Sequence, residues 1–440
     1  MKTLIVAGLL IAGGMVPAVE AVAQEPLRLT DVYRATRERN PRIQAAGSLV
    51  EARRAMEPGA GLPPDPEVQI GAMNFSLPGL SANMPTSMVP SVQVMQMLPL
   101  FGKLGLSERI AEQSTDIARA DAAEAWWEVR AEAAMAFYEV YQADREIVVM
   151  KETLRLLQDF RKVAQAMYSA GEGRQADVLR AGVEVARMEA EIKRMEAMRV
   201  SAAARLNAVL NAAPDAAVSS PELPPLPALI PGGDTLRTWA EAARPMLARG
   251  RTEVDQADSR LQLARKEIWP DLTVGLQYGQ RRAAMAAADP AMPAEYATER
   301  MGSVMLGFSV PLFAGKRQMK MREEAEAMRQ MAHADLTRMR TQVNARIGEL
   351  VANLDRNRTL IALYQTDVLP QADANVTSSF SSYRVGQVDF MTLVDAQMTA
   401  NQYKQELAAL LAQYGADVAE LEMTIGRELP VMASLKAEGR

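Results

Sequence analysis

The chain has 440 residues, of which 49% are hydrophobic, 23% are charged and only 5% are aromatic, and its formal net charge is -5 at pH 7. Nothing in this slightly acidic balance suggests a nucleic-acid partner, and the lack of cysteine excludes disulfides, thiol chemistry and a cysteine-linked lipid. Long tracts rich in Ala, Met, Glu, Arg and Leu favour extended helices packed along seams over a bulky globular core.

The N-terminus MKTLIVAGLLIAGGMVPAVEAVAQ combines a lysine, a short apolar stretch from Leu4 to Val16, and small residues at Ala21 and Ala23. This pattern is typical of a secretory signal peptide, which we assign to residues 1–23 and leave out of the fold. No later segment offers the ~20 uninterrupted apolar residues of a transmembrane helix. We therefore expect the exported chain to lack a helical membrane anchor.

The first half of the exported chain reads as helix, two strands, long helix, glycine break and helix. A helix is expected over 41–62, and the stretches EVQIGAMNFSL and SVQVMQMLPL form a strand hairpin. A very long helix covers 105–168, the break YSAGEGRQADVL follows, and a shorter helix covers 173–210. The apolar seam of this last helix has the 3-4 spacing of a coiled coil, with Arg199 as its single violation.

The second half repeats this order. The stretch SSPELPPLPALIPGGD is too rich in proline for a helix and separates the halves. Beyond it, three motifs of the first half recur in the same order: VPLFAGK corresponds to LPLFGK, YRVGQVDFMTLV to YSAGEGRQADVL, and LEMTIG to LNAVLN. We assign one domain over 24–426, in which repeats 27–211 and 235–426 flank a connector over 212–234 and a tail over 427–440 follows.

The helix lengths predict how each half is arranged. A long helix in each half, 105–168 or 317–383, matches the combined length of two shorter helices. We expect the shorter helices to stack nearly end to end along the long one. The glycine breaks are then hairpin tips, far from the rest of the protein.

The four predicted strands carry the membrane signature. In the stretch LTVGLQYG, apolar residues alternate strictly with small or polar ones, and SVMLGFSVPL alternates as cleanly. Strands of ~10 residues with one apolar face are typical of a transmembrane β-barrel wall, which must be closed and needs at least about eight strands. Four strands per chain therefore predict an oligomer.

At this point the sequence resembles the TolC-type outer-membrane efflux channels, through the paired motifs LPLFGK and VPLFAGK, the paired breaks, and the terminal LEMTIG. The resemblance covers nearly the whole exported chain. It implies a mainly α fold with a membrane β-barrel portion: a homotrimer in outer-membrane lipid, with twelve barrel strands and a long periplasmic tube of coiled-coil helices. It also implies two partners, a periplasmic adaptor protein and an inner-membrane pump of the resistance-nodulation-division type, and no cofactor.

The resemblance implies where the tube meets its adaptor. In the family the tips contact helical hairpins of that protein, which points to Tyr168, Gly171, Tyr383 and Gly386. The alternative is that glycine serves only to turn the chain, and both roles can hold.

Family channels also narrow near the tips with rings of acidic side chains. The positions that carry these acids align here with Thr392 and Asp395, so one acid is missing, and the first repeat offers Asp177 and Arg180 at the equivalent places. The resemblance thus implies a constriction at Asp395, Thr392 and Asp177. The alternative is a set of solvated charges on outer helix faces.

The cargo has several candidates. Methionines cluster around both strand hairpins, and thioethers are soft ligands suited to Cu(I), although Met is also an adaptable packing residue. The stretch MNFSLPG before MLPLFGK further resembles family members that serve heavy-metal pumps. Heavy-metal ions therefore stand beside drugs, other small molecules and type I secretion as alternatives, and we assign no metal-binding residue.

Two other classes of protein were weighed. An enzyme is disfavoured because the sequence has no nucleophile with a base, no phosphate-binding loop and no metal-ligand spacing. A periplasmic adaptor also contains helical hairpins, but it would not carry a duplicated plan of strand hairpin and long helix. The sequence analysis therefore predicts a channel.

Overall fold

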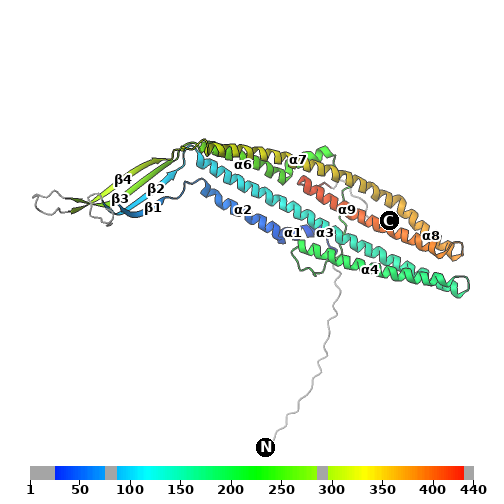
Figure 1. Cartoon of the computed structure of the whole chain (residues 1–440). Helices are drawn as coiled ribbons and strands as arrows, with labels where there is room; N and C mark the ends of the chain where they lie inside the picture. Colours follow the sequence, from blue (N-terminus) through cyan, green and yellow to red (C-terminus); the bar gives the residue numbers. More distant parts are fainter. Residues whose placement is uncertain (1–24, 75–86, 285–295, 431–440) are drawn as a thin grey trace, which may run out of the picture.

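The computed structural model describes residues 25–74, 87–284 and 296–430, with no account of the side chains at 282–284 and 296. The signal peptide expected over 1–23 and most of the tail expected over 427–440 lie outside these ranges. The molecule is elongated, with strands at one end and two helical hairpin tips at the other (Figure 1). None of the helices in the described ranges combines the length and the hydropathy that a membrane span requires.

The strands form one antiparallel sheet. Its order is β1-β2-β3-β4, so the hairpins of the two repeats join through β2 and β3, with Val94 opposite Leu276. The bounds are Glu67–Met73 for β1, Met88–Leu98 for β2, Leu272–Ala284 for β3 and Tyr296–Phe308 for β4. Both predicted hairpins are confirmed, and strands β1 and β4 are left at the two edges of the sheet.

The helices run away from the sheet in a single layer. The first repeat has α1 (Leu29–Arg39), α2 (Pro41–Ala60), α3 (Lys103–Ser169) and α4 (Gln175–Val209). The second has α5 (Gly233–Ala243), α6 (Pro245–Lys266), α7 (Gln318–Leu363), the π-helical turn η1 (Tyr364–Val368), α8 (Leu369–Arg384) and α9 (Phe390–Ile425). Helices α2 and α4 both pack on α3 and follow one another along it (Figure 1), which confirms the end-to-end stacking in the first repeat.

The second long helix differs from the first, and the expectation of one uninterrupted helix over 317–383 was wrong in this detail. A π-helical turn at Tyr364–Val368 separates α7 from α8, and Pro370 follows directly. Proline has no N–H, and its ring would clash with the carbonyl of Thr366 in a regular helix. A wider π turn accommodates such a defect without ending the helix.

The internal repeat extends to backbone conformation. Gly171 and Gly386 both adopt the left-handed conformation, with φ of 77° and 70°. Asn211 and Gly426, which end the two repeats, do the same with φ of 51° and 69°. A left-handed residue after the last turn is a common helix terminator, so the matching motifs LNAVLN and LEMTIG end their helices in the same way.

Equivalent hydrogen bonds in the two repeats hold the start of α2 against the end of α4 and the start of α6 against the end of α9. Asn40 Nδ2 donates to the carbonyl of Val209 at 2.8 Å, and Arg244 Nη1 donates to the carbonyl of Thr424 at 3.1 Å. Each bond satisfies a carbonyl near the C-terminus of α4 or α9, where the helix has no donor of its own. Two different side chains therefore make one equivalent contact in the two repeats.

The core lies in the middle of the helical layer, where α3, α4, α7 and α9 meet the connector. Phe137, Leu206, Ile347 and Tyr414 are fully buried there. The coiled-coil seam expected in α4 is confirmed, and its exception Arg199 forms an ion pair with Asp144 of α3 at 2.7 Å.

Candidate functional site

The first tip joins α3 to α4 through two glycines with different roles. No atom lies within 4 Å of a Cβ placed on Gly171, so its positive φ is the only demand for glycine there. A Cβ on Gly173 would lie 2.8 Å from the backbone nitrogen of Tyr168, and the Gly173 N–H donates to the carbonyl of Met167 at 3.0 Å. The tight turn therefore depends on Gly173 for space and on Gly171 for conformation.

The second tip, between α8 and α9, is closed by a helix cap. The left-handed Gly386 follows α8, and Asp389 stands at the N-cap of α9. One Asp389 carboxylate oxygen accepts both the Thr392 N–H at 2.9 Å and the Thr392 hydroxyl at 2.8 Å. These bonds satisfy an otherwise unpaired donor of the first helical turn.

The two tips pack against one another. Buried apolar side chains of α3, α4, α8 and α9 form a common cluster, in which Phe160 stacks on Phe380 with ring centroids 5.2 Å apart. Tyr383 also meets Phe390 at 5.5 Å. The tube end of each chain is therefore one packed unit of four helix ends rather than two independent hairpins.

Charges of one tip act on the other. Burial raises the pKa of the Tyr383 hydroxyl, and the carboxylate of Asp177 at the start of α4 raises it further. The bonds from Thr392 lower the pKa of Asp389, and the guanidinium groups of Arg180 and Arg174 lower it further. Asp177 and the two arginines belong to the first tip, whereas Tyr383 and Asp389 belong to the second.

The proposed adaptor-contact residues differ in accessibility. Tyr168 is 46% exposed, and Gly171 and Gly386 are exposed as well. Tyr383 is only 4% exposed and packs inside the tip cluster. The side chain of Tyr383 thus supports the turn from within, whereas Tyr168 is presented to solvent.

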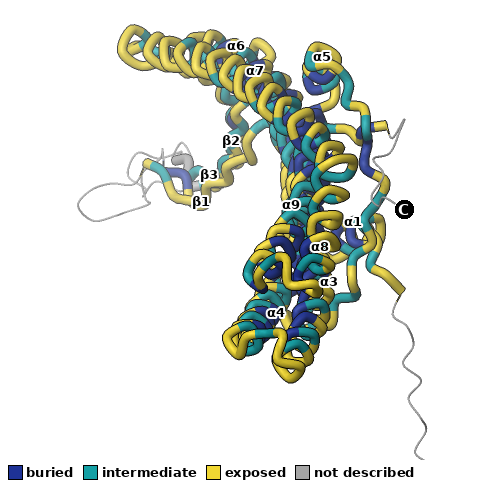
Figure 2. The backbone as a smooth tube through the Cα atoms, turned by 90° about the vertical axis from the view of Figure 1, so that its right-hand side faces the viewer, coloured by how far each residue is buried: buried dark blue, intermediate teal, exposed yellow. Residues whose placement is uncertain are grey.

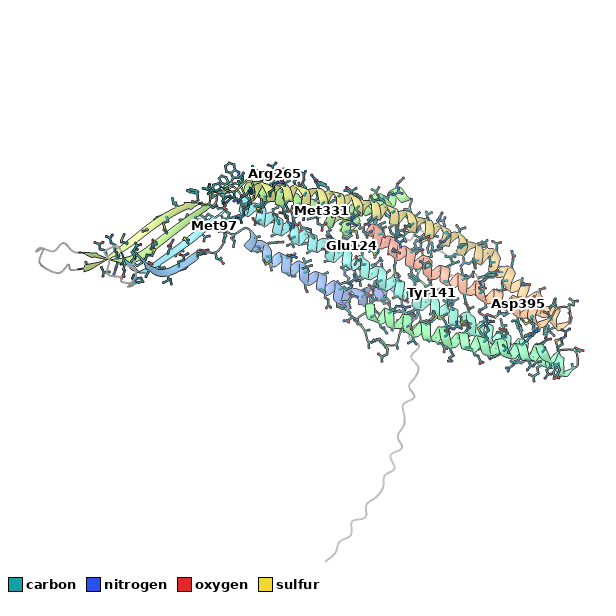
Figure 3. All side chains as sticks on the ribbon, in the orientation of Figure 1. Met97, Glu124, Tyr141, Arg265, Met331 and Asp395 are labelled. Atoms are coloured by element: carbon teal, nitrogen blue, oxygen red, sulfur yellow. The ribbon has the colours of Figure 1, made fainter. Side chains whose placement is uncertain are left out.

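The proposed constriction residues lie close to the same end (Figure 3 labels Asp395). Asp395 and Thr392 are exposed on α9, with Thr399 and Gln402 continuing the same polar strip, and Asp177 is half-buried. The Thr392 hydroxyl is engaged by Asp389, so its observed role is capping. Asp395 carries the free carboxylate that faces solvent on this strip.

At the other end, the sheet presents two chemically different faces. One face is apolar across all four strands in the register Val68, Val94, Leu276, Val304. The opposite face carries the row Gln69, Gln93, Gln277, Ser303. It also carries an ion pair between Arg281 and Glu299 at 2.9 Å. Lipid would accept the first face and water the second.

A lysine holds the junction between sheet and helices. The Lys103 side chain is 5% exposed, and its Nζ donates to the carbonyl of Trp269 at 3.0 Å and to Asp271 Oδ1 at 2.9 Å. Since Lys103 begins α3 and Asp271 precedes β3, the ammonium group ties the two repeats together where strands become helices. This lysine is the last residue of the motif LPLFGK.

Sequence reasoning missed several of these residues. Gly173 has no matching glycine in the second repeat, so the repeat does not single it out, whereas Asp389 at the start of a predicted helix is a visible capping signal. The role of Lys103 could be inferred only from its recurrence in both repeats. The effect of the Arg174 and Arg180 charges on Asp389 of the second tip could not be predicted from the sequence, because the two tips are far apart along the chain.

Comparisons with known proteins fit this arrangement. The family model described as "Outer membrane efflux protein" matches residues 32–212 and 236–427. The cobalt-zinc-cadmium resistance protein CzcC of Cupriavidus metallidurans is 24% identical over 333 residues, which cover 75% of each chain.

Two solved structures share the fold. The outer membrane protein VceC of Vibrio cholerae superposes with a TM-score of 0.75 at 17% identity, over 91% of this chain and 96% of VceC. CusC, a transmembrane channel protein, superposes with a TM-score of 0.75 at 13% identity, over 91% and 92%.

Proposed function

The chain belongs to the outer membrane efflux protein family, and from that premise we propose that three copies close one channel that exports metal cations. As a member of the family it is a channel component of an efflux system and not an enzyme, and it lies in the outer membrane with a long periplasmic extension. Outer membrane efflux proteins are trimeric and act with a periplasmic adaptor and an inner-membrane pump.

The observation that carries the proposal is the two-faced sheet with open edges. Strand β1 pairs only with β2 and strand β4 only with β3 in the described chain. An open edge within lipid would leave a row of backbone N–H and C=O groups unpaired, at a cost of several kcal/mol for each group. Pairing of β4 with β1 of a neighbouring copy removes both edges, and three copies give a closed wall of twelve strands.

The helical layer supports the same assembly. In the view of Figure 2 the helices lie along an arc, with exposed residues along both sides. Helix α2 has no buried residue, and its Leu49 and Met56 are exposed, as are Met328 and Met331 of α7. These helices belong to the two edges of the layer, where neighbouring copies in a closed tube would cover them.

The lysine at the junction between sheet and helices also supports the three-chain assembly. The motifs LPLFGK and VPLFAGK map Lys103 onto Lys316, and the equivalent strand registers of the two hairpins map Asp271 onto Asp65. Lys316 and Asp65 are exposed, and neither side chain bonds to another residue in the described ranges. Because β4 and β1 would meet as β2 and β3 do, Lys316 of one copy pairs with Asp65 of the next.

At the periplasmic end the exposed tip surface is the proposed adaptor contact. Tyr168, Gly171 and Gly386 present it, and the packed tip cluster gives it a fixed shape. Three copies of Asp395 would form an acidic ring at the pore constriction, with Thr392 one turn earlier on α9 and Asp177 in the first turn of α4. The resemblance of the sequence points to a resistance-nodulation-division pump as the energy source.

A metal cargo is supported by the relative CzcC, whose name records resistance to cobalt, zinc and cadmium. Small cations need only a hydrated path, so this proposal does not require a large apolar chamber. Drugs or secreted proteins are the alternatives.

The assembly is tested by measuring the mass of the detergent-solubilised protein by native mass spectrometry. We expect three chains in one particle, because the sheet cannot close in one chain. A stable monomer or dimer as the main species would refute the channel architecture.

The cargo is tested by deleting the gene in its native host and exposing cells to metal salts and to organic antibiotics. Sensitivity to metals with unchanged resistance to antibiotics is the expected result. Sensitivity confined to organic compounds would assign the channel to drug efflux instead.

A further inference from the structure

The polar face of the sheet carries an unusual set of side chains. Six methionines lie on it together with the glutamine row: Met73, Met88, Met95, Met97, Met301 and Met305. Their positions follow from strand alternation and register, since Met95 and Met305 flank Gly275, and Met301 lies opposite Gly279. Met97 marks the end of the set closest to the helices (Figure 3).

The neighbours of this set indicate that the face is the lumen side of the barrel. An ion pair between Arg281 and Glu299, and the amides of Gln69, Gln93 and Gln277, would be costly to place against lipid tails. The opposite face carries valine, isoleucine, leucine, tyrosine and phenylalanine over the middle of the sheet, with Gln96 near the helices and the pair Gln280 and Arg300 toward the far end. The six thioethers therefore line the path that the cargo takes through the membrane.

The methionines are paired across glycines of β3. A Cβ on Gly275 would lie 3.3 Å from Met305 Cε and 3.6 Å from Met95 Cγ, so side chains from both neighbouring strands lean over this position. Gly279 repeats the arrangement, because Met88 Cε would lie 2.5 Å from its Cβ and Met301 lies opposite it in the register. The two glycines are four residues apart, or about 13 Å along a strand at ~3.3 Å per residue.

Resting on the proposed channel function, we infer that these glycine-spaced methionine pairs form two levels of weak binding sites for soft monovalent cations of the Cu(I) and Ag(I) class. A thioether is a soft, neutral ligand that suits such ions. Each level contributes two sulfurs per copy, so a closed trimer offers six sulfurs around the lumen at each level. Weak binding at successive levels lets an ion enter and leave, as conduction requires.

Harder divalent ions have no comparable site here. The chain contains no cysteine, and its one histidine, His333, is exposed on α7 and not in the sheet. No group of three or more His, Asp or Glu side chains suited to a metal occurs within the described ranges. Zinc and cobalt would therefore pass this face without specific ligands, whereas Ag(I) and Cu(I) would be retained briefly.

The alternative explanation is that these methionines only fill space, because Met is an adaptable packing residue. The two explanations differ in what leucine does at the same positions. Leucine keeps the volume and hydrophobicity of methionine but has no sulfur. A Met→Leu change therefore removes the ligand and leaves the packing.

The test uses the purified full-length channel in planar lipid bilayers, in potassium nitrate so that silver stays in solution. Silver nitrate is the probe because Ag(I) is a redox-stable soft cation. We expect Ag(I) to interrupt the potassium current reversibly in the wild type. In the Met88→Leu/Met95→Leu/Met301→Leu/Met305→Leu variant, which removes the sulfurs of both levels, apparent Ag(I) affinity should fall about tenfold or more, since even changes around a ligand set reduce metal affinity about 10- to 100-fold.

The matched control is Met56→Leu/Met198→Leu, which changes two exposed methionines on α2 and α4 and should leave the Ag(I) response intact. Zinc nitrate should act equally on all three proteins. An unchanged Ag(I) response in the variant that lacks all four methionines, or a conducting wild type that ignores Ag(I), would overturn the soft-cation sites while leaving the channel in place. A wild-type trimer that carries no potassium current would instead refute the channel and these sites with it.

Discussion

Lysine 103 shows how one side chain joins strands to helices. Its ammonium group is nearly buried and bonds to the Trp269 carbonyl and the Asp271 carboxylate. A buried cation of this kind is tolerated only when hydrogen bonds and an opposite charge compensate for lost hydration. The equivalent Lys316 has no such compensation among the described residues of its own chain, which is why we place its partner in the neighbouring copy.

The junction gives a charge-reversal prediction. In Lys316→Glu, the new carboxylate would face Asp65 of the next copy, so the temperature at which the trimer dissociates should fall by several degrees. Adding Asp65→Lys to the same chain should recover most of the loss, because the pair is restored with its charges exchanged. Trimer content after heating, followed by native gel electrophoresis, measures both effects. Equal dissociation temperatures for Lys316→Glu and the wild type would place Lys316 outside the seam.

Asp395 gives a prediction for the pore. Three copies of its exposed carboxylate around the trimer axis would attract cations and repel anions, as acidic rings do in cation pores. Asp395→Asn should therefore reduce cation preference and weaken block by multivalent cations in planar bilayers. The control is Asp373→Asn, an exposed aspartate of α8 paired with Lys404 at 3.1 Å. Unaltered selectivity and block in Asp395→Asn would mean that Asp395 lies on the outer face of the tube.

At the scale of elements, the tips depend on backbone conformation more than on side-chain contacts. Gly171 and Gly386 have open space where a Cβ would stand, so only their positive φ opposes substitution. A left-handed conformation costs an ordinary residue about 1–2 kcal/mol and costs a β-branched residue more, whereas Asn adopts it readily. The same turn can therefore be either distorted or preserved by choice of residue.

We expect Gly171→Val/Gly386→Val to reach the outer membrane in normal amounts yet to lose efflux, because the changed turns lie at the proposed adaptor contact and far from the sheet. Gly171→Asn/Gly386→Asn should keep both properties. Immunoblots of outer-membrane fractions and a cellular export assay make the comparison. Normal export by the valine variant would show that the tips are not a docking surface that depends on their shape.

The elements that could be predicted from the sequence are those with a periodic hydrophobic pattern. Period-two alternation predicted β3 and β4, and 3-4 spacing predicted the seam of α4, because both patterns repeat over many residues. Pro370 is the sequence signal for an irregularity in the second long helix, and it lies just after the π turn that divides this helix. The close approach of Gly173 to Tyr168, and the burial of Tyr383 against Phe390, depend on tertiary contacts that have no periodic signature.

At the scale of the whole molecule, duplication made the architecture predictable and left part of the site unpredictable. Two matching halves predicted four wall strands per chain, too few to close a barrel, and hence an oligomer. Equivalent positions nevertheless diverge in their surroundings. Tyr168 is exposed and Tyr383 is buried, and Lys103 forms an ion pair whereas Lys316 forms none within the part of the chain that the structure describes. Such differences arise because a motif in one repeat packs against its own chain, whereas the equivalent motif in the other repeat is exposed.

The central claim is that β4 of one copy pairs with β1 of the next until three chains close a ring. The register of β2 on β3, transferred by the internal repeat, places Leu306 opposite Ile70 of the neighbouring copy. Opposed residues in antiparallel strands have Cα atoms about 4.5–5.5 Å apart, which is within the reach of a disulfide. The natural lack of cysteine provides a clean background for such a pair.

Oxidation of Leu306→Cys/Ile70→Cys in membranes therefore tests the account most directly. We predict covalent dimers and trimers on denaturing gels with nothing larger, and no cross-link in Leu306→Cys/Gln69→Cys, whose side chains point to opposite faces of the sheet. A ladder that ends at two chains or runs beyond three, or the absence of any cross-link in Leu306→Cys/Ile70→Cys, would contradict a three-chain ring closed through β4 and β1.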